Sequence, residues 1–258
     1  MKPKKENIYP PLKDLEEKRI KLKNKIYAVA IGYTTTFFVV CSSICKKSPA
    51  FYIGSSVVYI LIAVILYSYL VKGYKQDFKE DVIHPLVKEI DQNLSYYPNL
   101  HILEEQFNNS DIFDKPDRID GNDYVKGELD GVKIEFSDFY AQKKLTGRKS
   151  ENRWSTIFQG LFIVCEFDKE FTKELIINSK DSKKFQDIFN LKDQIDNTVY
   201  ISIKHNKVYI AIEYNKDLFE PSIFHSLLNY KIADEYVKTL HLVLNIVEEL
   251  KQNKKLWS

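Results

Sequence analysis

Two long apolar stretches near the N-terminus constrain this chain more than any other feature. Residues 26–45 (IYAVAIGYTTTFFVVCSSIC) and 48–71 (SPAFYIGSSVVYILIAVILYSYLV) contain no charged side chain, and Lys46 and Lys47 separate them. A helix rises about 1.5 Å per residue, so each stretch can cross a hydrocarbon core of about 30 Å. Hydrocarbon offers the backbone no hydrogen-bond partner, so a crossing stretch must be helical. We therefore predict an antiparallel transmembrane hairpin rather than two buried helices of a soluble core.

The rest of the chain has the composition of a soluble domain. Of 258 residues, 44% are hydrophobic and 29% are charged, and the mean hydropathy of -0.33 is too polar for a multi-span transporter. The residues after position 73 suffice for one domain with its own core. The sequence predicts a basic juxtamembrane helix at 1–25, a transmembrane hairpin at 26–73 and a cytosolic α+β domain at 74–258. The net charge of +2 gives no overall field that favours nucleic acid.

Basic residues around the apolar stretches predict their orientation. Six lysines and arginines precede the first stretch and four follow the second, all within about 20 residues of an end, whereas the connection carries two. Because basic residues collect on the cytoplasmic side, both termini are expected in the cytoplasm. The first stretch is too long for a signal peptide and is followed at once by the second, so we expect both to remain as spans.

The N-terminal segment carries a short repeat of apolar positions. Leu12, Leu15, Arg19, Leu22 and Ile26 alternate at spacings of three and four residues, with an arginine inside the series. This pattern is typical of a coiled-coil seam, and a solvated helical extension of the first span is the alternative. Both interpretations give one helix that runs from water into the bilayer.

Small residues recur at every fourth position of both apolar stretches. Ala28, Gly32 and Thr36 form such a series in the first, and Ala50 and Gly54 do so in the second. Small residues at this spacing let helices approach closely. The series could serve packing within the hairpin or contact with a second copy of the chain, and both alternatives stay open.

The central region predicts β-hairpins. Apolar and polar residues alternate on either side of Asp130-Gly131, and a two-residue turn there would pair Leu129 with Val132. A turn at His205-Asn206 would give a second hairpin by the same logic, with residue 203 opposite 208. Between them, residues 156–167 are nearly all apolar, which indicates a central strand buried on both faces, and residues 174–177 form a further short strand.

Amphipathic helices are expected before and after these strands. One follows the second span from Tyr74, with a kink or an end near Ile83 because of Pro85; a short one covers 102–107, and a long one closes the chain with an apolar stripe from Tyr236 to Leu250. The polar stretch 108–123 is interpreted as a linker loop. The predicted fold class is α+β, an antiparallel sheet with flanking helices. The alternative is a pleckstrin-like open barrel plugged by the last helix.

Three stretches resemble a known bacterial family. They are Gly127-Glu128-Leu129-Asp130-Gly131 running into Phe136-Ser137, then Phe158-Gln159-Gly160-Leu161-Phe162, and the closing segment Leu250 to Trp257. Together they resemble the domain of unknown function 3137, and the resemblance extends from Ile26 onward. It implies two spans followed by a cytoplasmic domain at the bacterial inner membrane. The family offers no established catalytic residue to transfer.

No catalytic, cofactor or metal motif stands out in the sequence. The five histidines and three cysteines follow no zinc spacing, and there is no phosphate-binding loop. Cys165 lies in an apolar stretch, which favours packing over reactivity. Aspartates at every third position from Asp111 to Asp123 suggest a divalent cation, but they lack the ligand order of an EF-hand, so a solvated acidic loop is the preferred interpretation. We predict no catalytic residue, no cofactor and no metal ligand.

One basic stretch is a candidate binding site. Residues 143–154 (KKLTGRKSENRW) join two predicted strands and carry a single acidic residue. A solvated hairpin loop is the simpler interpretation, and contact with anionic lipid headgroups is the functional one, since each basic residue near such a surface contributes about 1 kcal/mol. The candidate contact residues are Lys143, Lys144, Arg148, Lys149 and Arg153.

Two classes of function fit these observations. The preferred one is a membrane-anchored cytosolic binding or scaffold module whose partner is a lipid, a membrane protein or a second copy of the chain. The alternative is an envelope-associated enzyme that acts on a small or lipidic substrate. A deep cleft with two or more acidic or histidine side chains would favour the enzyme, and a shallow basic or apolar face would favour the module.

Overall fold

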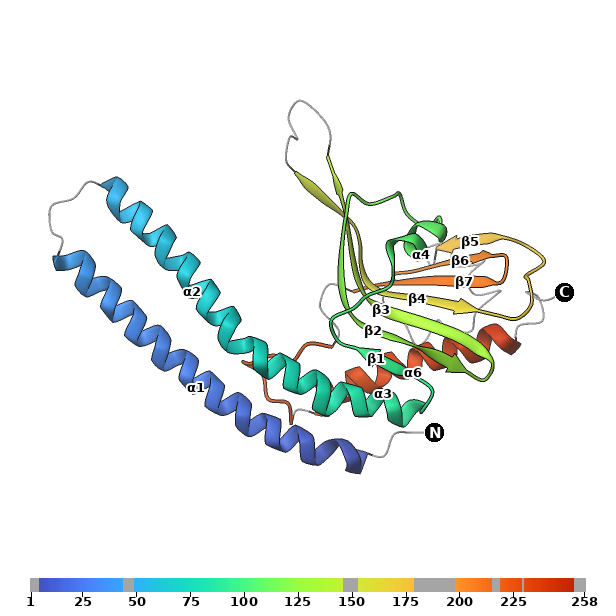
Figure 1. Cartoon of the computed structure of the whole chain (residues 1–258), viewed down its shortest axis with the longest axis horizontal. Helices are drawn as coiled ribbons and strands as arrows, with labels where there is room; N and C mark the ends of the chain where they lie inside the picture. Colours follow the sequence, from blue (N-terminus) through green and yellow to red (C-terminus); the bar gives the residue numbers. More distant parts are fainter. Residues whose placement is uncertain are drawn as a thin grey trace. The chain divides into compact units, whose positions relative to one another are not determined.

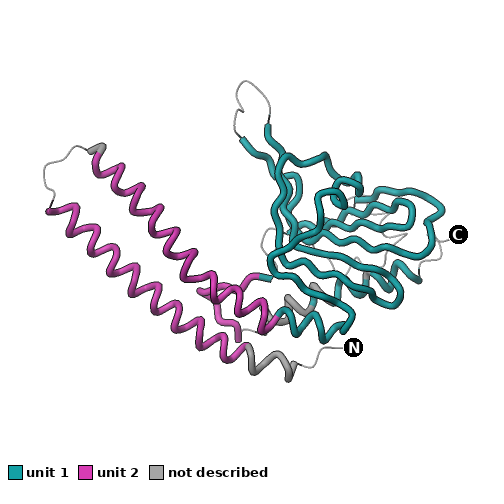
Figure 2. Tube along the Cα trace, in the orientation of Figure 1, with its two compact units in different colours: residues 1–3, 83–219, 234–258 teal, residues 4–82, 220–233 magenta. Residues whose placement is uncertain are grey.

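Two compact units make up the chain. The computed structural model describes residues 5–43, 49–145, 153–178, 198–214, 219–228 and 230–252. One unit contains the sheet and comprises residues 83–219 with 1–3 and 234–258, and the other contains the long helices and comprises 4–82 with 220–233 (Figure 2). The second unit is therefore built from two segments that are far apart in the sequence.

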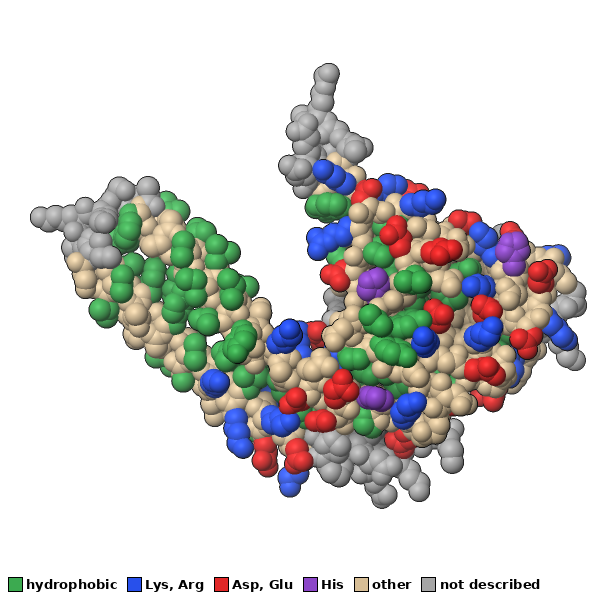
Figure 3. Space-filling view, in the orientation of Figure 1, with side chains coloured by type: hydrophobic (Ala, Val, Ile, Leu, Met, Phe, Trp, Pro, Cys, Tyr) green, Lys and Arg blue, Asp and Glu red, His purple; other side chains and the backbone are tan. Residues whose placement is uncertain are grey.

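The helical unit is a hairpin of two long helices, α1 (Lys5–Ser43) and α2 (Pro49–Phe78) (Figure 1). Both are long and apolar enough to cross a membrane, and the apolar part of each is exposed. Figure 3 shows hydrophobic side chains spread over this part of the hairpin, with charged side chains gathered below it. The predicted transmembrane hairpin is confirmed as a fold. Because α1 is continuous from Lys5, the basic segment and the first apolar stretch form one helix, as both interpretations of its repeat require.

An aromatic pair joins the two helices of the hairpin. The ring of Tyr33 stacks on that of Tyr59 with centroids 4.5 Å apart, and the Thr34 hydroxyl lies 2.6 Å from the Tyr59 hydroxyl. The small residues do not take part in such packing, since an added Cβ at Gly32 or Gly54 would meet no described atom within 4 Å. Packing within the hairpin is thus the wrong alternative for these two glycines.

The helix that follows α2 is interrupted as Pro85 predicts. After α2 come a π-helical turn, η1 (Lys79–Ile83), and α3 (His84–Ile90), in whose first turn Pro85 lies. Proline has no N–H to donate and clashes with the preceding turn, so the regular α-helix cannot continue through it. The wider π turn accommodates the interruption, and the chain stays helical through Ile83 (φ −70°, ψ −45°) instead of ending there.

The other unit is built on an open antiparallel sheet of seven strands in the order β1-β2-β3-β4-β7-β6-β5. Because the order of the described strands is linear, the sheet is open, and the predicted α+β class is confirmed. The strands are β1 (Ser95–Tyr97), β2 (Arg118–Leu129), β3 (Val132–Lys144), β4 (Trp154–Glu166), β5 (Leu175–Asn178), β6 (Val199–Lys204) and β7 (Lys207–Glu213).

Both predicted hairpins form in the predicted register. Leu129 lies opposite Val132, and residue 203 lies opposite 208. The first turn uses left-handed backbone at Asp130 (φ 48°) and Gly131 (φ 81°). Aspartate and glycine tolerate this conformation, and its twist matches that of the strands. The predicted strand at 174–177 is also present as β5, which pairs with β6.

Strand β4 lies at the centre of the sheet and is buried on both faces, as its apolar sequence predicts. On one face Phe158 and Phe162 join an aromatic cluster with Phe107 of α4 (Glu104–Asn109) and Phe139 of β3. The alternate residues Leu161, Ile163 and Cys165 are fully buried as well. Figure 1 shows α4 in front of the sheet and α6 (Tyr230–Gln252) behind it.

The polar stretch 108–123 is not a loop throughout, so that prediction is wrong over its second half. Strand β2 begins at Arg118, where the backbone pairs with Gln142 of β3. Pairing uses backbone groups, so polar side chains at the end of a sheet do not prevent it. The short predicted helix is also shifted, from 102–107 to 104–109.

The closing helix is confirmed. Val243, Val247 and Leu250 of its predicted stripe are buried, and Lys251 donates a hydrogen bond of 2.7 Å to the carbonyl of Asp130. This bond places the end of α6 beside the β2–β3 turn.

Candidate functional site

The β3–β4 hairpin extends beyond the other strands of the sheet. Its pairing continues to Lys144 opposite Trp154, whereas β2 has no partner on β3 beyond Gln142 and β7 pairs with β4 only from Gly160 onward. Residues 142–145 and 153–156 therefore form a two-stranded projection, here called the arm, which Figure 1 shows leaving the sheet. A bulge between Ala141 and Gln142 marks its base, and bulges bend and re-aim a strand.

The arm presents basic and apolar side chains together. Lys144 and Arg153 are exposed, Trp154 is 44% exposed and Leu145 is 39% exposed. The amide N–H of Leu145 donates to the carbonyl of Arg153 at 2.9 Å, so the ladder continues to this pair. Protein surfaces that lie at the boundary between lipid headgroups and acyl chains combine large apolar residues with lysine and arginine.

The structure describes three of the five candidate lipid-contact residues. Lys143, Lys144 and Arg153 lie on the arm, whereas Arg148 and Lys149 fall outside the described residues. Lys143 donates to a carboxylate oxygen of Asp114 at 2.8 Å, and this hydrogen bond holds the pKa of Asp114 below its usual range. The charge of Lys143 is thus partly balanced, and the free basic character of the described arm comes from Lys144 and Arg153.

The aspartates of the acidic stretch do not converge on one point. Asp111 pairs with Lys204, Asp114 with Lys143, and Asp117 accepts the backbone N–H of Lys144 at 2.8 Å. Asp123 is buried and accepts the hydroxyl hydrogen of Tyr96. Among the described residues, no three His, Cys, Asp or Glu side chains are placed to hold a metal ion. The acidic stretch therefore fastens its loop to β3, β6 and β1.

A small depression lies on β2, β3 and β4 near the base of the arm. Its volume is about 210 Å³, and Asp120, Asp138, Tyr140 and Gln159 contribute side chains. Pockets that enclose small molecules usually have volumes of about 300–1,000 Å³. Two aspartates are among its lining residues, but the depression is smaller than the deep cleft that would favour the enzyme alternative.

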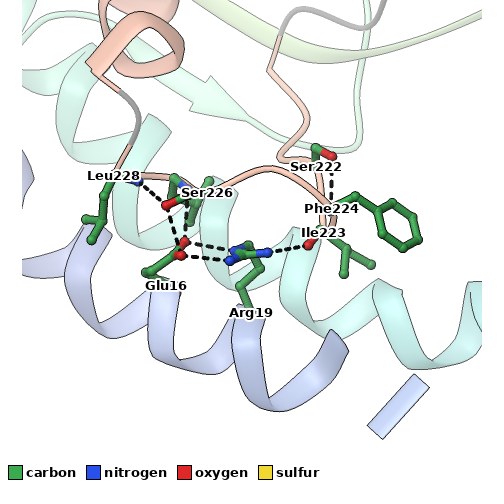
Figure 4. A network of polar contacts seen from close by, with 8 residues as sticks. Glu16, Arg19, Ser222, Ile223, Phe224, Ser226 and Leu228 are labelled. Atoms are coloured by element: carbon green, nitrogen blue, oxygen red, sulfur yellow. Dashed lines mark hydrogen bonds and ion pairs between the residues drawn. The ribbon is translucent and has the colours of Figure 1, made fainter. Parts of the chain in front are cut away.

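A buried polar network lies in the helical unit, outside the apolar stretches. Arg19 of α1 forms two hydrogen bonds with the carboxylate of Glu16, at 2.8 and 2.7 Å, and a third with the carbonyl of Ile223 at 2.6 Å (Figure 4). Glu16 also accepts hydrogen bonds from the Ser226 hydroxyl and from the backbone N–H of Leu227, both at 2.9 Å. Both charged side chains are nearly inaccessible to solvent. Residues 220–228, here called the strap, are thereby fastened to α1.

The sequence contains one signal for this network. Arg19 stands within an otherwise apolar repeat, and the structure buries it together with Leu12 and Leu15. A buried arginine requires an acidic partner and further acceptors. Glu16, three residues earlier, supplies the first, but nothing in the sequence identifies the strap, which lies about 200 positions away.

The fold defines a class of protein in which a two-helix membrane-type hairpin carries an α+β domain with an open antiparallel sheet. Residues 183–252 match the family model described as "Protein of unknown function (DUF3137)". The resemblance to this family is thus confirmed for a segment that includes β6, β7 and α6. The comparisons with curated proteins and with solved structures give no match.

Proposed function

We propose that this protein is a membrane-anchored cytosolic binding module that contacts anionic lipid through the arm. The hairpin of α1 and α2 anchors the chain in a bacterial inner membrane with both termini in the cytoplasm. The basic flanks of the apolar stretches support this orientation. The same module can hold a second copy of the chain or a membrane protein.

The observation that carries the proposal is the composition of the arm. It leaves the sheet as a two-stranded projection and exposes Trp154 and Leu145 next to Lys144 and Arg153. Tethering keeps such a surface at high local concentration near the bilayer. Each basic residue near an anionic surface contributes about 1 kcal/mol, which suffices for a reversible contact. The exposed basic and apolar side chains of the arm also favour a module over an enzyme.

The test uses Trp154 as its reporter. The chain has two tryptophans, so Trp257→Phe leaves Trp154 as the single emitter in the full-length protein. In nanodiscs that contain phosphatidylglycerol, its emission should shift to the blue at low salt relative to phosphatidylcholine nanodiscs. The shift should disappear near 0.5 M salt, where the Debye length is about 4–5 Å.

Two charge variants complete the test. Replacing the five candidate residues with Gln should abolish the phosphatidylglycerol-dependent shift and change stability by no more than about 0.5 kcal/mol, as surface substitutions usually do. The matched control removes five basic residues elsewhere and should keep the shift. An unchanged shift in the arm variant would contradict the proposal. The control residues are Lys88, Lys126, Lys169, Lys173 and Lys238.

A further inference from the structure

The strap is attached to both helices of the hairpin. Arg19 and Glu16 hold it on α1, and Lys75 of α2 forms an ion pair with Glu220. Arg19 contacts Ile223 whereas Glu16, which precedes Arg19, contacts Leu227, so the strap runs antiparallel to α1. Its first residues are therefore the ones nearest the apolar part of the hairpin.

The helix register gives the depth of these attachments. Lys75 lies four residues after Val71, the end of the second apolar stretch, and Arg19 lies seven residues before Ile26, the start of the first. At a rise of about 1.5 Å per residue, these points are roughly 6 and 10 Å from the apolar stretches. The headgroup layer on each side of a hydrocarbon core is about 5–8 Å thick. Residues 220–224 are thus held at the level of the headgroups or just outside them.

One large apolar side chain of the strap is left exposed at this level. Pro221, Ile223 and Leu227 are buried, whereas Phe224 is 55% exposed. Figure 4 shows Phe224 on the Arg19 side and Leu228 on the Glu16 side of this ion pair. Since Arg19 is the closer of the two to Ile26, Phe224 lies on the side that faces the apolar stretches. Leu228, also exposed, lies at the far end.

Charge at this level fits a phospholipid surface. The exposed lysines Lys21, Lys25 and Lys72 lie on α1 and α2 close to the ends of the apolar stretches. An exposed aromatic ring and exposed lysines on the flanks of the apolar stretches match the boundary between acyl chains and headgroups, where rings are favoured and lysines meet lipid phosphate. In water the exposed phenyl ring contributes no hydrophobic stabilisation, because its apolar area remains hydrated.

We propose that the strap is a second membrane contact, in which Phe224 inserts at the headgroup boundary of the bilayer that the hairpin crosses. The Glu16–Arg19 pair positions Phe224, because a bidentate pair with three further hydrogen bonds to the strap fixes the backbone on either side of this residue. The inference rests on the proposed anchoring of the hairpin. It concerns a different surface from the arm and links the segment after β7 directly to the lipid.

Depth-dependent quenching tests the inference in the full-length protein. Trp154→Phe and Trp257→Phe remove the native tryptophans, and single tryptophans are then placed by F224W, L228W or Y67W. Each variant is reconstituted in vesicles whose lipids carry bromine on the upper part of the acyl chain. F224W emission should fall about twofold, whereas L228W, an exposed position on the same strap, should change little, because interfacial side chains reach only about 5–10 Å into the boundary.

The Y67W variant separates this inference from the proposed function. Tyr67 lies within the second apolar stretch, so its replacement should be quenched if the hairpin crosses the bilayer. Quenching of Y67W with none in F224W would overturn the strap contact and leave the anchoring intact. No quenching in either would overturn both proposals.

A further substitution tests the positioning role of the ion pair. Arg19→Met in the F224W background removes the contact with the Ile223 carbonyl and should return F224W emission toward that of L228W. Arg19→Lys keeps the charge but not the paired geometry and should give an intermediate value. Full quenching in the Arg19→Met variant would overturn the positioning role.

Discussion

Gly160 shows how one residue can hold the centre of the sheet. Its φ is +150°, and a Cβ added there would lie 2.0 Å from the carbonyl oxygen of Ile212 on β7. The close approach of β4 and β7 therefore requires glycine at this position. An alanine would have to separate the two strands or distort β4.

Gly160→Ala should lower the free energy of unfolding by about 1–3 kcal/mol, the usual cost of overpacking. Gly131→Ala is the matched control, since its φ is +81° but an added Cβ meets no described atom within 4 Å. The control should cost only about 1 kcal/mol. Urea unfolding in detergent micelles, followed by circular dichroism, measures both. Equal losses would contradict the close approach of β4 to β7.

Cys165 is the residue whose chemistry the sequence predicts most directly. It is fully buried on β4, and burial raises the pKa of its thiol to about 12. Since the thiolate is the reactive form, the native protein should not react with maleimide at this position at pH 7.5. Labelling should appear only when urea opens the sheet, as mass spectrometry of the peptide would show. Rapid labelling of the native state would contradict the burial of β4 on both faces.

The hydrogen-bond network around Arg19 shows which partners of a single residue can be predicted from the sequence and which cannot. An arginine in an apolar repeat can be noticed in the sequence, and Glu16 can be named as its neighbour. The second partner of Arg19, the Ile223 carbonyl, is a backbone group. Backbone acceptors carry no sequence signature, so no pattern could have named it.

The elements that short-range patterns specify are the ones predicted correctly. Asp130-Gly131 and His205-Asn206 fix both hairpins because turn type and alternation agree. The start of β2 at Arg118 was missed, because its first residues are polar and gain their order from the backbone of β3. Pairing between segments that are distant in the sequence depends on the partner strand as much as on the sequence of the strand itself.

Glu166 links three strands and gives the sheet a dependence on pH. Its carboxylate accepts from Lys133 of β3 at 3.0 Å and lies 3.3 Å from the ammonium group of Lys207 on β7. The hydrogen bond from Lys133 lowers the pKa of Glu166, with Lys207 adding to it against the effect of burial. A lowered pKa in the folded state means that the stabilisation is present at neutral pH and is lost as the pH falls through that pKa.

Glu166→Gln should therefore cost about 0.5–1 kcal/mol near pH 7, the range for partly exposed pairs. Below the ordinary glutamate pKa of about 4.3, the difference between wild type and variant should shrink toward zero. Urea unfolding at a series of pH values measures this difference. A difference that grows toward low pH would contradict the assigned sign.

For the chain as a whole, the sequence predicts the order of the hairpin and the α+β domain better than it predicts which segments make up each unit. The transmembrane-type hairpin and the α+β domain follow from the apolar stretches and the strand patterns. The strap does not, because residues 220–228 join the helical unit although they lie between β7 and α6 in the chain. Contacts between segments this far apart leave no local pattern.

The proposed function requires the hairpin to cross a bilayer with both termini on the cytoplasmic side. Alkaline phosphatase, which is active only outside the cytoplasm, and green fluorescent protein, which fluoresces only inside it, are fused in parallel after Ser258 and expressed in a bacterium. We expect a fluorescent fusion and an inactive phosphatase, because ten basic residues flank the outer ends of the two stretches against two in the connection. An active phosphatase with a dark fluorescent fusion would contradict this orientation.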